Sequence, residues 1–325
     1  MNLFTPKGAV AKPIVYKDDE IKDISFNKLR WIDIVRPTKK SIDFLEKEFG
    51  FHELLLEDCL TEHQRPKIDD YDDYCFIVLQ LPRYRKGLFR LDSEEIDIFL
   101  SKDYIVTLHE GELKPLTNFS TICSNSESDR REYMNEGSAL LLYEIVKRLL
   151  DYCFPLTDKI GYSINNINRN IFIDRSEKML ENISNIKLQI INFRKVIKPL
   201  RPVILMLEKI IKNYMPEDQE VYFDDITDKI EQIWNMLENY KETIESLENT
   251  FSSLTNHRAN NLMRTFTIVQ VITLPMVLVG GLFSMNVGGI PFNGDSVGFL
   301  IVFGMIMIPT LSIATLLIIN RKRWL

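Results

Sequence analysis

The stretch TFTIVQVITLPMVLVGGLFSMN, residues 265–286, decides how this chain is organised. No charged residue occurs between Arg264 and Asp295. A helix from residue 265 to Phe283 would be about 28 Å long, close to the thickness of the hydrocarbon core of a bilayer. A second uncharged run, residues 296–320, is followed only by the basic segment 321–325, RKRWL. We therefore expect two C-terminal transmembrane spans, 265–283 and 296–320, joined by a short loop, residues 284–295.

The remainder of the chain is polar and acidic. The whole chain carries a net charge of -6, and the part after Arg264 carries +2, so residues 1–264 carry -8. Such a surplus of carboxylates disfavours nucleic acid as a partner and favours a field that attracts cations. An acidic surface also keeps a domain soluble, and the charge balance alone fits either role.

Several features indicate a cell-membrane protein with both termini in the cytoplasm. No signal peptide is recognised at the N-terminus. The four cysteines are scattered, without CxxC spacing, and each lies in an apolar context, as is typical of reduced, buried thiols in a cytoplasmic domain. The basic segment 321–325, with Arg258 and Arg264 before the first span, places both ends of the membrane region on the cytoplasmic side. We expect residues 284–295 to lie outside.

Composition changes along the chain predict an α+β membrane protein. Residues 1–135 mix strand-like runs (30–35, 75–81, 96–100, 104–108) with helices at 38–49 and 52–60, which fits one α/β domain. The polar stretch 124–137 indicates a boundary between this domain and the next part of the chain. A helical region, 138–223, follows, with helices at 138–173, 176–198 and, after a break at Pro199, 200–214. One very long helix, 224–283, then forms a stalk that continues into the first span.

The stalk carries two stripes whose spacing alternates between four and three residues. An apolar stripe predicts a packed seam: Ile226, Ile230, Ile233, Leu237, Tyr240, Ile244, Leu247, Phe251, Leu254. A second stripe, on roughly the opposite face, runs Asn249, Ser253, Asn256, Asn260, Met263, Thr267, Gln270, Leu274, Val277, Gly281, Ser284. Its first part would suit the solvated face of any stalk. Thr267 and Gln270, however, continue it into the bilayer, which favours a wet interior face surrounded by several copies of the chain.

With these features in place, the chain resembles the CorA-type magnesium transporters. Where that family closes its first span with Gly-Met-Asn, this chain has Ser284-Met285-Asn286, preceded by Pro275 and Gly281. The family's basic-Trp-Leu terminus is matched by residues 321–325. Its N-terminal signature is similar to Glu57-Asp58, residues 64–67 (QRPK) and residues 71–74 (YDDY).

The resemblance implies a homopentameric channel for divalent cations, most readily Mg²⁺. Ser284, Met285 and Asn286 would form the selectivity mouth, where a ring of Asn286 amides recognises the hydrated ion. Asn249, Asn260 and Gly281 would line the pore. Met263 and Leu274 would form hydrophobic gates, although as packing residues they would look the same. Asp225 and Asp228 match positions of a regulatory metal site between subunits.

Three departures from the family pattern leave ion identity and regulation open. Ser284 replaces the signature glycine. The loop segment 287–292, VGGIPF, looks more like the zinc-transporting branch, so a Zn²⁺, Co²⁺ or Ni²⁺ transporter is the alternative. The position of an acidic partner for Asp225 and Asp228 is occupied by Arg85.

Other classes of function find little support in the sequence. The four histidines lack metal-ligand spacing, and no nucleophile, phosphate loop or paired-carboxylate motif appears, so we expect neither an enzyme nor a cofactor. A membrane-anchored scaffold is a further alternative, but it would need neither Thr267 nor Gln270 in its span.

Overall fold

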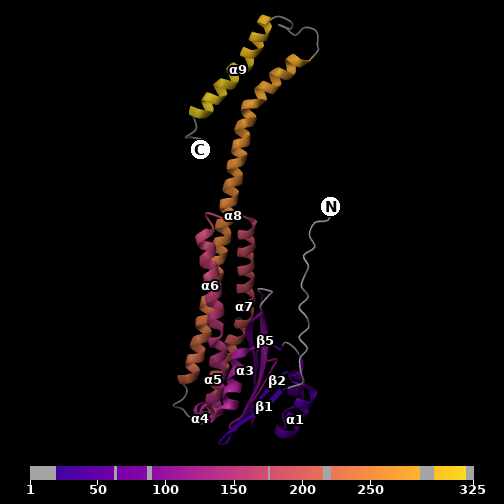
Figure 1. The fold of residues 1–325 in the computed structure, drawn as a ribbon, viewed down its shortest axis with the longest axis vertical. Coiled ribbons are helices and arrows are strands. Elements are labelled where there is room, and N and C mark those ends of the chain that lie inside the picture. The colour runs from indigo at the N-terminus through magenta and orange to yellow at the C-terminus, as the bar shows by residue number, and fades with distance from the viewer. Residues whose placement is uncertain are drawn as a thin grey trace. The chain divides into compact units, whose positions relative to one another are not determined.

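The computed structural model describes residues 20–61, 64–85, 90–174, 176–214, 221–285 and 296–319. The chain divides into two compact units, Met1–Glu248 and Asn249–Leu325, and each is described by itself. Figure 1 shows the sheet and its covering helices, which belong to the first unit, and the C-terminal part of α8 and the whole of α9, which belong to the second.

The first unit is built on a six-stranded mixed sheet in the order β1-β2-β6-β5-β4-β3. All neighbouring strands pair antiparallel except β2 and β6, which run parallel. The strands are β1 (Glu20–Phe26), β2 (Leu29–Val35), β3 (Lys67–Asp70), β4 (Cys75–Arg85), β5 (Arg90–Leu100) and β6 (Tyr104–His109). Residues 75–79 are buried without alternation, as expected for a strand covered on both faces.

Two short helices, α1 (Lys39–Phe49) and α2 (Glu53–Asp58), cover one face of the sheet. The prediction that Thr38 starts a helix is confirmed, because its backbone N–H is bound by Ser41 Oγ at 2.7 Å and its carbonyl accepts from Ile42 N at 3.1 Å. Gly50 ends α1 at φ 68°, a conformation that glycine adopts without strain. The apolar side chains of both helices join Phe76, Phe99 and other strand residues in one core.

The stretch that the sequence suggested as a boundary is instead helical and folded onto the same unit. Helices α3 (Lys114–Asn125) and α4 (Glu127–Met134) contact β1 and helix α5 (Ser138–Asp151). Ser126 caps α4 by accepting from Asp129 N at 3.4 Å. The polar composition of 124–137 therefore reflects exposed helix faces, while Met134 is buried beneath them.

Two of the predicted helix boundaries are wrong. The expected helix 138–173 ends as α5 at Asp151 and resumes as α6 (Cys153–Asn170) after Tyr152, because Pro155 lacks the N–H that would extend α5 and suits the first turn of a new helix. The expected break at Pro199 is absent, since α7 (Glu177–Ile210) continues through Pro199 and Pro202. Burial of Leu200, Val203, Ile204 and Leu207 outweighs the lost backbone hydrogen bonds.

The long stalk helix is confirmed as α8 (Val221–Ser284), and most of its apolar seam is buried. Ion pairs tie this part of α8 to α7 at 2.5–2.6 Å between Lys187 and Glu248, Arg194 and Glu238, and Arg201 and Glu231. Of the predicted seam, seven residues are buried: Ile226, Ile230, Ile233, Leu237, Ile244, Leu247, Phe251.

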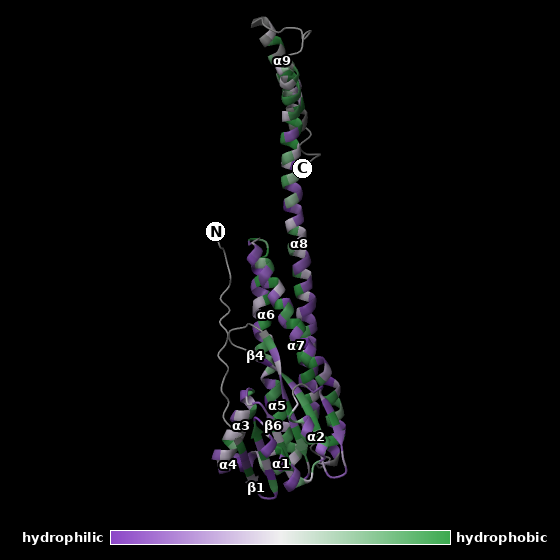
Figure 2. Ribbon diagram, turned by 90° about the vertical axis from the view of Figure 1, so that its right-hand side faces the viewer, coloured by the Kyte–Doolittle hydropathy of each residue, from purple (hydrophilic) through white to green (hydrophobic). Residues whose placement is uncertain are grey.

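The second unit contains the rest of α8 and the 24-residue helix α9 (Ser296–Ile319). Among the described residues, one helix, Val221–Leu282, is long and apolar enough to cross a membrane, and a shorter apolar stretch runs from Phe303 to Ile313 within α9. Figure 2 colours the C-terminal part of α8 mostly green and pale, as expected of a lipid-facing segment.

Candidate ion-conducting and acidic sites

The second stripe of α8 is uncovered in the single chain, where the described residues of α8 from Ser252 to Met285 are exposed or half-buried on every face. Asn249, Asn260, Gly281 and Ser284 are all exposed to solvent in the single chain. The two predicted gate residues are also uncovered, with exposed fractions of 68% for Met263 and 55% for Leu274. A face that combines amides, hydroxyls and large apolar side chains is thus left without a partner by the described residues of the second unit.

The hydroxyls on this stripe bond to their own helix. Thr267 Oγ1 donates to Met263 O at 2.9 Å, and Ser284 Oγ donates to Gly281 O at 2.9 Å. A threonine that is satisfied in this way is tolerated in a membrane helix without water. Gln270 is different, because its amide is exposed and makes no hydrogen bond within the described residues. The sequence argument for a wet face therefore rests on Gln270 more than on Thr267.

Helix α8 ends at the residues predicted to form the mouth. Ser284 is its last helical residue, and Met285 follows in a bend, with its N–H 3.4 Å from Leu282 O. The last carbonyls of a helix carry partial negative charge that favours a nearby cation. Asn286 and the loop 286–295 lie outside the described residues, as does the basic segment 321–325. At Gly281 an added Cβ would meet no atom within 4 Å, so the single chain does not require a glycine there.

The two stalk carboxylates predicted as a regulatory metal site lie one turn apart near the start of α8. Asp225 Oδ2 accepts a hydrogen bond from the Tyr143 hydroxyl on α5 at 3.2 Å, while Asp228 is exposed. Burial raises the pKa of Tyr143, which keeps it a phenol donor. Arg85 ends β4 opposite Arg90, and its side chain lies outside the described residues.

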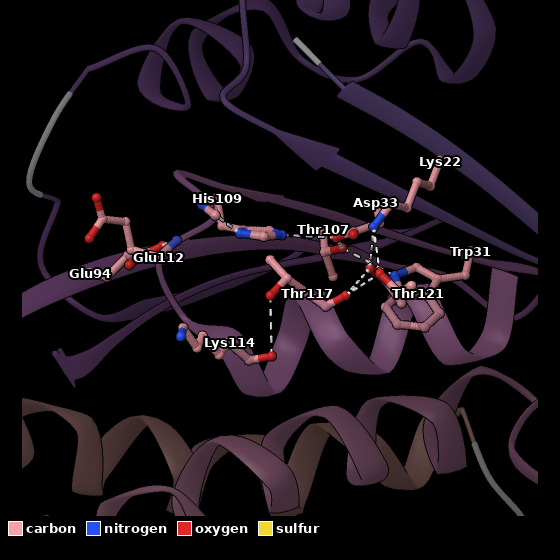
Figure 3. A network of polar contacts seen from close by, with 12 residues as sticks. Lys22, Trp31, Asp33, Glu94, Thr107, His109, Glu112, Lys114, Thr117 and Thr121 are labelled. Carbon is pink, nitrogen blue, oxygen red and sulfur yellow. Dashed lines mark hydrogen bonds and ion pairs between the residues drawn. The ribbon is translucent and has the colours of Figure 1, made fainter. Parts of the chain in front are cut away.

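A buried polar network that the sequence did not reveal lies on one face of the sheet, beside α3 (Figure 3). Asp33 Oδ1 accepts from Thr107 Oγ1 at 2.7 Å and lies 3.0 Å from His109 Nε2, and Trp31 Nε1 donates to Thr107 Oγ1 at 3.1 Å. His109 Nδ1 accepts from Gly111 N at 2.9 Å, so Nε2 carries the proton that binds Asp33.

The environment of Asp33 keeps it ionised. Burial would raise its pKa, but the hydrogen bond from His109 and the neighbouring hydroxyls outweigh burial, and the pKa of Asp33 is lowered. Strands β2 and β6 are far apart in sequence, but they pair in parallel, and this pairing places Asp33 opposite Thr107. In the sequence, the only indication of this network is that Asp33 and Thr107 are polar residues within otherwise apolar strand-like runs.

Beyond His109 the network reaches an acidic cavity, and Figure 3 shows Glu94 and Glu112 at that end. Glu94 Oε1 accepts from Glu112 N at 2.9 Å, and Arg83 Nη1 lies 3.2 Å from Glu112 and 3.6 Å from Glu94. Burial raises the pKa of Glu94 and raises that of Asp97 well above its usual range, with Glu95 adding to the latter.

Comparison with known proteins places these features in context. A family model described as a CorA-like Mg²⁺ transporter protein matches residues 26–323. The cobalt/magnesium transport protein CorA of Thermotoga maritima is 26% identical, over 85% of this chain and 78% of that protein. The zinc transport protein ZntB of Yersinia pestis is 21% identical, over 91% of this chain and 88% of that protein.

Solved structures agree on the fold. The complete structure of the CorA magnesium transporter from Methanocaldococcus jannaschii superposes with a TM-score of 0.78 at 20% identity, covering 93% of this chain and 94% of that one. The full-length CmaX protein superposes with a TM-score of 0.71 at 19% identity, covering 91% of this chain and 88% of that one.

Proposed function

Because this chain belongs to the CorA-like Mg²⁺ transporter family, we propose that it carries divalent metal ions, Mg²⁺ foremost, across a membrane as a homopentamer. The observation that carries the proposal is the uncovered stripe of α8, with exposed Asn260, Gln270 and Leu274. One helix cannot enclose an aqueous path, but copies arranged around a common axis bury such a stripe and line a pore with it.

Recognition of the ion falls to the end of α8. Mg²⁺ sheds water reluctantly, so neutral oxygens that hydrogen-bond its hydration shell suit it better than a tight carboxylate cage. A ring of Asn286 amides, one from each subunit, would supply such oxygens beyond Ser284 and Met285. The C-terminal carbonyls of α8 would add attraction for a cation at the same level.

The pore would narrow at two apolar rings. Leu274 and Met263 lie on the same stripe as the polar residues, about three and six turns before the end of α8. Rings of such side chains close a channel to ions by excluding water. Asn249 and Asn260 would line the wider part of the path.

The arrangement in the membrane follows the sequence features. Residues 265–283 and 296–320 would cross the bilayer, with the loop 284–295 outside and both termini in the cytoplasm. Residues 1–135 and 138–223 would then form the cytoplasmic α/β and helical parts, and we expect neither a resident cofactor nor nucleic acid as a partner.

Zinc is the second candidate ion. The loop segment 287–292 resembles that of the zinc-transporting branch, and zinc transport proteins are among the relatives of this chain. Uptake of Mg²⁺, Zn²⁺ and Co²⁺ into liposomes that contain the purified protein tests both candidates. We expect Mg²⁺ to enter and to compete with Co²⁺, whereas entry of Zn²⁺ unaffected by excess Mg²⁺ would favour the second candidate. Entry of none of the three would contradict the proposal.

A further inference from the structure

A cavity of about 300 Å³ opens in the first unit where β5 begins and β6 ends. Arg83 is the one lysine or arginine among its described lining residues, and it is already shared between Asp92, Glu94 and Glu112 at 3.2–3.6 Å. The carboxylates that line the cavity are Asp92, Glu94, Glu95, Asp97, Glu110, Glu112. This concentration of carboxyl oxygens provides the kind of ligand atoms that a hard divalent cation prefers.

Two of these carboxylates are buried and incompletely satisfied. Asp97 is 4% exposed and Glu94 is 3% exposed. Neither Asp97 Oδ1 nor Glu94 Oε2 has a hydrogen-bond partner within the described residues, but Glu94 Oε2 lies 3.6 Å from the Arg83 guanidinium, which partly compensates it. A buried polar atom without a partner is costly, and folded proteins rarely leave one without a ligand or water to satisfy it. Asp97 lines the cavity, so something that enters it could supply the partner that Asp97 Oδ1 lacks.

Asp97 has a second carboxylate close by on its own strand. Glu95 lies two residues away on β5 and therefore on the same face of the sheet. One oxygen of Glu95 is held by Gln64 N at 2.6 Å, which fixes the direction of its side chain. Two carboxylates fixed on one face can share a single divalent cation between them.

The size of the cavity favours an ion that keeps its water. A volume of about 300 Å³ is far above the minimum that one water needs, so the cavity has room for a cation with its first hydration shell. Among the described residues, no three His, Cys, Asp or Glu side chains are close enough to clasp a bare ion. Mg²⁺ is characteristically held in this looser way, through one or two carboxylates and several waters.

We propose that this cavity is a binding site for a hydrated divalent cation, with Asp97 and Glu95 as its anchors. The site lies within one subunit and shares no residue with the predicted mouth at Ser284–Asn286 or with Asp225 and Asp228. It therefore does not depend on transport through α8.

The test uses the full-length protein in detergent and Mn²⁺ as a probe for a hydrated divalent ion. Bound Mn²⁺ per subunit is counted by electron paramagnetic resonance for the wild type, Asp97→Asn and the control Asp72→Asn, whose side chain is exposed. We expect Asp97→Asn to bind one Mn²⁺ fewer per subunit, Asp72→Asn to match the wild type, and excess Mg²⁺ to displace the ion. Equal binding by all three proteins would overturn the proposal.

Two further variants test the site independently of the folding of Asp97→Asn and of transport. Glu95→Gln, checked for assembly by gel filtration, should show the same loss if Asp97→Asn assembles poorly, and retention of every Mn²⁺ by Glu95→Gln would count against the site. Displacement by Zn²⁺ but not by Mg²⁺ would point to the neighbouring Cys59 thiol as a direct ligand and would overturn the hydrated-ion proposal. Asn286→Ala should retain this site, so failed transport and a failed site give different results.

Discussion

The Tyr143 hydroxyl donates a hydrogen bond to Asp225 Oδ2 at 3.2 Å and ties the start of α8 to α5 of the same chain. Lys147 stands over the Tyr143 ring, with Nζ 5.1 Å from its centroid, and adds positive charge near the carboxylate. Asp225, a predicted ligand of a regulatory metal between subunits, is thus already engaged within its own subunit. This arrangement lowers the attraction that Asp225 offers to an external cation.

The first prediction concerns regulation by internal Mg²⁺. An inhibitory ion acts only by binding the closed state better than the open one. The resemblance implies that Arg85 occupies the sequence position of an acidic partner for this ion, where its positive charge would repel a cation. We expect internal Mg²⁺ to inhibit the wild type weakly and Arg85→Asp strongly, by about tenfold in apparent affinity, the equivalent of ~1.4 kcal/mol. Uptake measured against internal Mg²⁺ checks this. Strong inhibition of the wild type that the substitution leaves unchanged would contradict it.

The second prediction separates the two faces of α8. Leu274→Asn should wet an apolar ring and raise ion leak, because a polar side chain removes the barrier to water. Leu247→Ala lies on the buried seam, where Leu247 is 7% exposed, and should instead lower the free energy of unfolding by about 2–5 kcal/mol. Leak in liposomes and thermal unfolding distinguish them. Equal leak through the two variants would show that the faces are misassigned.

How far the sequence predicted the structure depended on the range of the interaction. The apolar seam from Ile226 to Phe251 and the helix start at Thr38 follow from local spacing and local hydrogen bonds, and both are confirmed. The path of α7 through Pro199 was missed, because packing against β4, β5 and α6, together with the Arg201–Glu231 pair, outweighs the local preference of proline.

Long-range contacts in the sheet could not be read from the sequence. Asp33 and His109 meet only because β2 pairs parallel with β6, and the cavity forms only because β4, β5 and the segment after β6 converge. The mouth at Asn286 was proposed from a motif and stays a prediction, since it lies outside the described residues.

The third prediction concerns the contact between α6 and α8. A Cβ added at Gly161 would lie 2.5 Å from Tyr240 Oη and 2.9 Å from its Cζ, so Gly161→Ala must displace the Tyr240 ring. We expect a loss of about 1–3 kcal/mol in the free energy of unfolding. Adding Tyr240→Phe removes the nearest atom and should restore part of the lost free energy of unfolding, as measured by denaturant titration. A Gly161→Ala protein as stable as the wild type would show that the helices are not this close.

The fourth prediction uses the ionised Asp33. Asp33→Asn replaces the carboxylate that accepts hydrogen bonds from His109 Nε2 and Thr107 Oγ1 and should cost about 1–3 kcal/mol near neutral pH, with Asp72→Asn as a neutral control. Because the pKa of Asp33 is lowered by folding, its contribution is fully present above the unfolded pKa of about 3.9 and is lost as pH falls through the folded value. The stability gap between wild type and Asp33→Asn should therefore narrow only below about pH 4. A gap that widens as pH falls would contradict the assignment.

Divalent-cation flux through Asn286→Ala tests the central claim most directly, with Asn293→Ala in the same loop as the matched control. Both proteins are reconstituted into liposomes after gel filtration has shown that they assemble like the wild type, as expected for a single small substitution in a loop. We expect Asn286→Ala to abolish Mg²⁺ uptake and Asn293→Ala to retain it. Near-normal Mg²⁺ uptake by a correctly assembled Asn286→Ala protein would contradict recognition of the ion at the end of α8.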